Sequence, residues 1–208
     1  MRTALPSQLI ANGTSIIDLP GKYSRATVEL PKYALKFAES HDRDAWNWAT
    51  NEAMNNGKPL VDWQGQPMFA ELAVASIFRS AGWQAYWSEC YGGLVFLDRM
   101  PNLPRGSRTA KLKQFGVTID PGKASLIESI RRKCTVPNYS CLDLIAWTPD
   151  RTVLVELKHI GRGKAANRGR KARDKLTDAQ LRFVDAALES NLLVADDILI
   201  VEWQFSTH

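Results

Sequence analysis

Cysteine and histidine are scarce in this chain, which has three of each among its 208 residues. The cysteines Cys90, Cys134 and Cys141 are widely spaced and form no CxxC pair. A zinc site or a disulfide framework is therefore not expected, and we predict free thiols in a reducing compartment. So few histidines also leave little from which to build a Ser–His or Cys–His nucleophilic site.

Long apolar runs are also missing from the sequence. No stretch approaches the ~18 residues that a transmembrane helix needs, and residues 1–13 lack the sustained apolar segment of a secretory signal peptide. The hydrophobic fraction of 45% is nevertheless enough to build a core. We therefore expect a soluble, cytoplasmic protein without a membrane partner, made of one domain with an extension or of two small domains.

The net charge of +5 is unevenly distributed along the chain. Residues 1–100 have 9 Lys and Arg against 10 Asp and Glu, whereas residues 101–208 have 18 against 12. A basic C-terminal half indicates an anionic partner, of which nucleic acid is the commonest. The same charge is also compatible with an ordinary solvated surface.

The apolar periodicity and the turn signals predict helices and strands that follow one another along the chain. Residues 1–30 are expected to be irregular. Helices are expected over residues 32–56, 67–80, 125–133 and 176–190, the last with an N-cap at Thr177 or Asp178. Strands are expected over residues 83–90, 94–98 and 197–205, and as a hairpin within residues 141–159. This order predicts an α/β fold with a mixed central β-sheet flanked by helices.

Two stretches are expected to lie outside that core. Residues 1–60 are predicted to form a partly helical N-terminal extension, ahead of a main domain over residues 61–208. Residues 100–124 carry five Lys or Arg among several Pro and Gly, and they predict a basic insertion.

The hairpin CLDLIAWTPDRTVLVELKH, residues 141–159, places polar residues at unusual positions. If Pro149 and Asp150 form a two-residue turn, Asp143 lies opposite Glu156, and Lys158 joins the same face. Two carboxylates directly opposite one another on a sheet repel, and a divalent cation between them would offset that repulsion. The opposite face is wholly apolar and must be buried. It consists of Leu142, Leu144, Ala146, Val153, Val155 and Leu157.

The same pattern also fits an Asp–Lys–Glu salt-bridge cluster, or a shifted register that sends the acids to solvent. Two further features favour a functional site. Glu71 lies on the apolar face of the helix predicted over 67–80, where a carboxylate is costly unless it is paired or bound to a metal. A basic loop also begins three residues after Lys158. His159 should point to the other face of the strand, as a packed side chain rather than a ligand.

These residues resemble the PD-(D/E)xK nuclease superfamily, which has a restriction-endonuclease-like fold. The resemblance rests on Asp143, followed after twelve residues by Glu156-Leu157-Lys158. The segments ELAVASIFRSAGWQAYW, VELKH and LTDAQLRF are most similar to its VRR-NUC branch, itself similar to archaeal-type Holliday junction resolvases. The similarity covers about residues 68–205, and residues 1–60 match nothing in it.

The resemblance implies roles for five residues. Asp143 and Glu156 would bind Mg²⁺, for which Mn²⁺ should substitute, and Glu71 would complete the metal shell. Lys158 would orient or activate the attacking water, and Gln180 would support the site.

Two departures from the family pattern stand out. The Pro that precedes the Asp in the family is Leu142 here, and Glu71 lies 72 residues before Asp143, so residues 100–124 must be inserted. Glu128 is a rival for the helix acid, but a strand must fit between that helix and Asp143, which favours Glu71.

The expected function is that of a metal-dependent nuclease, and DNA is favoured over RNA as its substrate. Structure-selective cleavage and a homodimer are both compatible with the family. The basic loop would hold the phosphate backbone through Arg162, Lys164, Arg168, Arg170, Lys171, Arg173 and Lys175. The first alternative is a non-catalytic nucleic-acid-binding or scaffolding protein of the same fold. The second is an unrelated α/β domain with an ion-paired hairpin.

Overall fold

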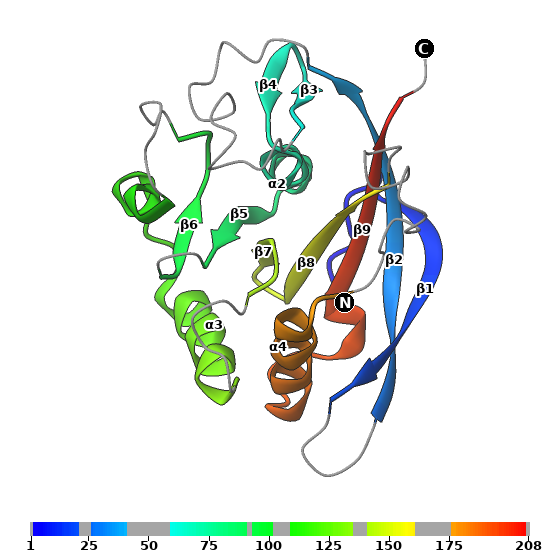
Figure 1. Ribbon diagram of the computed structural model, residues 1–208, viewed down its shortest axis with the longest axis vertical. Coiled ribbons are helices and arrows are strands. Elements are labelled where there is room, and N and C mark those ends of the chain that lie inside the picture. The colour runs from blue at the N-terminus through cyan, green and yellow to red at the C-terminus, as the bar shows by residue number, and fades with distance from the viewer. Residues whose placement is uncertain are drawn as a thin grey trace.

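A mixed β-sheet of nine strands forms the centre of the computed structural model, with helices on both faces (Figure 1). The structure describes residues 2–20, 26–40, 59–90, 93–101, 109–134, 141–160 and 176–206. The strands are β1 (Ile10–Leu19), β2 (Ala26–Glu39), β3 (Val61–Trp63), β4 (Gln66–Met68), β5 (Gln84–Glu89), β6 (Val95–Leu97), β7 (Leu144–Thr148), β8 (Arg151–His159) and β9 (Ile198–Phe205). The α-helices within these ranges are α2 (Ala70–Ser80), α3 (Pro121–Lys133) and α4 (Asp178–Glu189).

The strand order is β4-β3-β2-β9-β8-β7-β5-β6, and β1 pairs with β2. The three central strands β2, β9 and β8 run parallel, and the remaining pairs are antiparallel. Strands β8 and β9 are apolar over most of their length, as expected for parallel strands that are covered on both faces. The predicted α/β class with a mixed sheet flanked by helices is therefore confirmed.

Two hydrophobic cores lie on opposite faces of the sheet. Helix α2 covers one face, where Phe78 packs with Leu144 and Val155. Helices α3 and α4 cover the other face, where Ile127 and Phe183 belong to the same core. Figure 1 shows α2 above the sheet and α3 and α4 side by side below it. The sheet thus separates two helical layers, each with its own hydrophobic core.

The local sequence explains where the described helices begin. Helix α4 has a complete capping box, in which the Thr177 hydroxyl accepts a hydrogen bond from the Gln180 N–H and the Gln180 side chain accepts one from the Thr177 N–H. Helix α3 begins at Pro121, behind an Asp120 side chain that accepts from the Lys123 N–H. It therefore begins four residues before the predicted start at residue 125. The predicted cap at Thr177 is confirmed.

The hairpin has the predicted register. Thr148 pairs with Arg151, and the ladder continues to Leu144 opposite Val155. The predicted apolar face is buried against α2 from residue 144 onward. Leu142 is an exception, because it packs in the core on the α4 side. The regular alternation of the strand therefore ends at Asp143.

The N-terminal predictions were partly wrong. Residues 1–30 include β1 and the start of β2 rather than irregular chain, and residues 32–39 form a strand rather than the first part of a helix. The alternating residues Tyr33, Leu35 and Phe37 pack towards the α2 face, which is the period of a strand. Strand β2 lies between β3 and β9, so this part of the predicted extension belongs to the central sheet. Residues 41–58, the remainder of the predicted helix, lie outside the described ranges.

The predicted basic insertion at residues 100–124 is not all loop. Its described part contains a 3₁₀ segment at Thr109–Phe115 and the first turn of α3. Residues 102–108 lie outside the described ranges.

None of the helices that the structure describes is long and apolar enough to cross a membrane.

Candidate active site

Four segments meet at one end of the sheet. Strand β8 ends there with Glu156 and Lys158, and β7 begins there just after Asp143, because the two strands are antiparallel. Glu71 belongs to the first turn of α2, and Gln180 to the first turn of α4. The structure therefore brings elements that are distant in sequence to a single region.

Glu156 is the centre of a hydrogen-bond network. Its side chain is 3% exposed, and Oε1 accepts from Lys158 Nζ at 2.8 Å and from Gln180 Nε2 at 2.6 Å. Lys158 Nζ also donates to Gln180 Oε1 at 3.2 Å, and Thr177 N donates to the same oxygen at 2.9 Å. The cap of α4 and the polar network thus share one side chain, which fixes Gln180 in place.

Burial raises the pKa of the Glu156 carboxyl above its ordinary value. The Lys158 ammonium and the Gln180 amide act in the opposite direction, whereas the charge of Glu71 adds to the rise in the pKa of Glu156. Within the described part of the chain, no group donates a hydrogen bond to the buried Glu156 Oε2. A buried carboxylate oxygen of this kind is a suitable ligand for a hard cation such as Mg²⁺.

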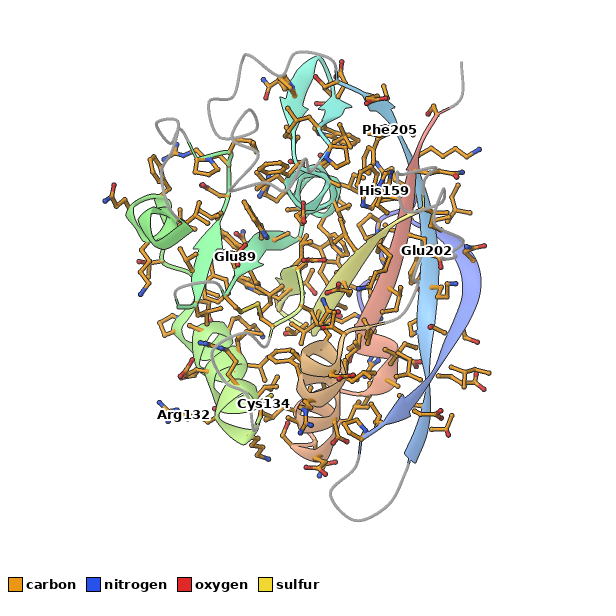
Figure 2. All side chains as sticks on the ribbon, in the orientation of Figure 1. Glu89, Arg132, Cys134, His159, Glu202 and Phe205 are labelled. Atoms are coloured by element: carbon orange, nitrogen blue, oxygen red, sulfur yellow. A yellow bond between two sulfur atoms is a disulfide. The ribbon has the colours of Figure 1, made fainter. Side chains whose placement is uncertain are left out.

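The structure places Glu71, and not Glu128, near Glu156. Glu71 is 4% exposed on α2 and contributes to the electrostatics of Glu156. The Glu128 side chain is 43% exposed and pairs with Arg131 and Arg132 on its own helix. Arg132 projects from α3 away from the sheet (Figure 2). The two candidates for the helix acid therefore have different environments, and Glu71 is the one that acts on Glu156.

Asp143 is held by backbone groups on both sides. Its Oδ2 accepts from the Leu157 N–H at 2.8 Å, and its carbonyl accepts from the Ser88 N–H at 2.8 Å. The side chain thus bonds to the residue that follows Glu156 in β8. This contact links Asp143 to the backbone of β8 just beyond the last pair of the ladder, Leu144 and Val155.

A disulfide joins Cys90 to Cys141, two residues before Asp143. The prediction of three free thiols is therefore wrong for this pair, while Cys134 lies buried outside the disulfide. The two cysteines are 51 residues apart in sequence, but their Cα atoms are 6.4 Å apart. They meet because β5, which ends just before Cys90, pairs with β7, which begins shortly after Cys141.

The predicted metal ligands do not form a closed cage. Among the residues that the structure describes, no three His, Cys, Asp or Glu side chains converge as a metal-binding group. Mg²⁺ commonly takes only one or two carboxylates and keeps several waters, so a closed cage is not required. The orphan oxygen of Glu156 and the buried acid Glu71 fit such an open site.

His159 and the basic loop after Lys158 are the remaining features that the sequence analysis singled out. His159 stacks on Trp203, with ring centroids 4.1 Å apart, but the residue itself is exposed rather than buried. The seven basic residues of the loop after Lys158 lie outside the described ranges.

Sequence reasoning missed the buried acid Glu202 on β9, which forms an ion pair with Lys32 on β2. An acid within the apolar run DILIVEWQF was the available signal.

No protein-family model, curated protein or solved structure matches the chain.

Proposed function

We propose that this protein is a metal-dependent nuclease that hydrolyses phosphodiester bonds, with a site of the PD-(D/E)xK type on a restriction-endonuclease-like core. The observation that carries the proposal is the environment of Glu156. This buried acid lies beside a lysine and an amide from α4, under the influence of a second buried acid, and one of its oxygens accepts no hydrogen bond from a described residue. Perturbed acids of this kind are concentrated at catalytic sites.

Glu156, Glu71 and Asp143 are the residues that would hold Mg²⁺ or Mn²⁺. The ion would supply positive charge that stabilises the phosphoryl group as negative charge develops in the transition state. Gln180 would keep the Glu156 carboxylate oriented, because it donates to Oε1 while its own oxygen is fixed by the cap of α4.

Lys158 would act directly on the substrate. Its ammonium has three N–H donors, and two of them point to Glu156 and Gln180. The third can donate to a phosphate oxygen or hold the attacking water. In the reaction, the water oxygen bonds to phosphorus, the ester bond breaks and the leaving oxygen takes a proton, so a compact cation at this position stabilises the charged transition state.

DNA is the substrate that we favour over RNA, on the family resemblance alone. The excess of basic residues in the C-terminal half supports an anionic polymer. The loop from Arg162 to Lys175 would add backbone contacts that position the substrate without reading its sequence.

A second candidate is a nucleic-acid-binding or scaffolding protein of the same fold that does not cleave. The observation in its favour is that Lys158 neutralises Glu156 and that the Leu157 N–H binds Asp143 Oδ2. These contacts are made among protein groups and would serve a purely structural role.

A substrate panel separates the two candidates. Linear duplex, supercoiled plasmid, single strand, flap and four-way junction are each incubated with Mg²⁺, Mn²⁺ or EDTA, using the wild type and the Glu156→Gln variant. Metal-dependent cleavage that the variant loses supports the nuclease. Binding to the panel without any cleavage supports the second candidate.

A further inference from the structure

A second buried acid, paired with a lysine, lies beside the candidate active site. Glu202 on β9 is 4% exposed, and its carboxylate forms an ion pair with Lys32 on β2. Asn12 Nδ2 donates a hydrogen bond to Glu202 Oε2 at 2.9 Å. Acids are almost never fully buried unless they are paired, and the chemistry proposed above uses none of these three residues. The pair therefore requires an explanation of its own.

The register of the sheet places this pair next to Glu156 and Lys158. The parallel strands β8, β9 and β2 are neighbours (Figure 1). Lys158 on β8 is the register partner of Glu202 on β9. Glu156 is the partner of Ile200, which is in turn the partner of Lys32. Neighbouring strands are about 4.8 Å apart, so the backbones of Glu156 and Lys32 are about 10 Å apart.

The charged residues of the two pairs also share one face of the sheet. On each of the three strands, an apolar or aromatic neighbour of the charged residue packs in the core under α2; these neighbours are Leu157, Trp203 and Tyr33. Side chains alternate between the two faces of a strand, so Lys158, Glu202 and Lys32 all point to the face of α4. The hydrogen bond from Lys158 to Gln180 on α4 agrees with this placement.

Both lysines reach solvent although their partner acids are buried. The side chain of Lys32 is 19% exposed, and that of Lys158 is 14% exposed. An ammonium has three N–H donors, and the ion pair of Lys32 with Glu202 requires only part of them. Asn12 holds Glu202, so the Lys32 ammonium has a fixed position before a ligand arrives.

Two fixed cations on one face suit a ligand with several phosphates. A nucleic-acid strand carries a negative charge at every nucleotide, and lysine binds phosphate as a compact point charge. When the scissile phosphate lies at Lys158, a strand that crosses β9 towards β2 brings a neighbouring phosphate to Lys32.

We propose that Lys32 is a second phosphate-binding residue of the site, which contacts the substrate backbone next to the scissile phosphodiester. Glu202 and Asn12 are positioning residues that hold its ammonium. The substrate strand then runs across the sheet from β8 towards β2. The inference rests on the proposed function, because that function places the scissile phosphate at Lys158.

The salt dependence of DNA binding tests the inference without any cleavage. Fluorescence anisotropy of a short labelled DNA duplex is measured in EDTA at several KCl concentrations. The compared proteins are Glu202→Gln and the double variant Glu202→Gln/Lys32→Met. Glu202→Gln keeps the shape of the side chain and removes its charge, so the loss of Lys32 leaves no buried carboxylate unpaired. Melting temperatures establish that each variant is folded.

The matched control is Lys123→Met in the same Glu202→Gln background. Lys123 is also partly buried, and its ammonium donates to the Thr152 hydroxyl at 2.7 Å. Thr152 lies near the start of β8, whereas Lys158 lies near its end. The control therefore removes the same charge far from the proposed phosphate site.

We expect the double variant with Lys32→Met to bind DNA about tenfold more weakly than Glu202→Gln, the loss of one charged hydrogen bond. The slope of log K against log salt should become shallower by about one, because one phosphate contact is lost. The Lys123 control should keep the slope. An unchanged slope without Lys32, or an equal change in the control, would overturn the inference, because a purely structural ion pair does not alter this slope. Absence of DNA binding by the wild type would overturn it as well.

The cleavage panel separates this result from the proposed function. Metal-dependent cleavage together with an unchanged salt slope would leave the nuclease in place and remove the role of Lys32. A slope that depends on Lys32 without any cleavage would leave Lys32 as a backbone contact and remove the nuclease.

Discussion

Gln180 donates a 2.6 Å hydrogen bond to Glu156 while the other end of its amide closes the cap of α4. A residue that the helix start requires is therefore the same residue that orients the buried acid. The position of the acid depends on the fold of α4, and a shift of that helix would change the environment of the carboxylate.

The first prediction concerns pH. Because burial raises the pKa of Glu156 above 4.5, the folded protein binds this proton more tightly than the unfolded chain. Stability in EDTA should therefore fall as the pH rises from about 4.5 through the folded pKa of Glu156. Glu156→Gln lacks this titration, so its stability advantage over the wild type should grow across that interval. Urea unfolding at several pH values measures the difference in unfolding free energy between the two proteins. A difference that stays constant with pH would contradict the prediction.

The second prediction concerns the ion pair of Lys158. Lys158→Met leaves a buried carboxylate without its cation and should cost about 3 kcal/mol of unfolding free energy. The double variant with Glu156→Gln should recover most of that loss, as a double-mutant cycle in urea would show. Lys123→Met is the control, because the Lys123 ammonium donates to the Thr152 hydroxyl. An additive double variant would argue against the pairing.

The third prediction separates the two helix acids. Glu71→Gln should reduce the rise in melting temperature that millimolar Mn²⁺ produces, because Glu71 lies near Glu156. Glu128→Gln should keep that response, since Glu128 pairs with Arg131 and Arg132. Loss of the Mn²⁺ response in Glu128→Gln, with the response retained in Glu71→Gln, would show instead that Glu128 on α3 is the helix acid.

The fourth prediction concerns the disulfide near Asp143. Reduction by a dithiol, or the Cys90→Ser variant, should cost about 3 kcal/mol of stability, because the cross-link closes a loop of 51 residues. Loss of the disulfide should also reduce the rise in melting temperature that Mn²⁺ produces, since Cys141 lies two residues from the proposed ligand Asp143. Cys134→Ala is the control, with its thiol outside the disulfide. Equal metal responses in the oxidised and reduced protein would show that the cross-link has no influence on the site.

The sequence predicts the hairpin and α4 well because their signals are local. The turn at Pro149 and Asp150 sets the register, and the cap at Thr177 sets the helix start. Strand β2 is different. Its lysines, leucines and alanines suit a helix as well as a strand, and pairing with the distant β9 decides the outcome.

Long-range pairing also explains what the sequence could not reveal at the site. The disulfide depends on β5 lying next to β7, and the Lys32–Glu202 ion pair depends on β2 lying next to β9. Neither adjacency has a local signal. Glu202 itself could have been found by the argument used for Glu156, as an acid within an apolar strand.

The most direct test of the central claim is Mn²⁺ binding at the Glu156 site, because it does not require the correct substrate. Electron paramagnetic resonance of the bound ion is measured for the wild type and for Glu156→Gln. We predict one bound ion per wild-type chain, displaced by Mg²⁺, and affinity at least tenfold weaker in the variant. Equal binding by both proteins, or none by the wild type at millimolar Mn²⁺, would contradict a catalytic metal site at Glu156.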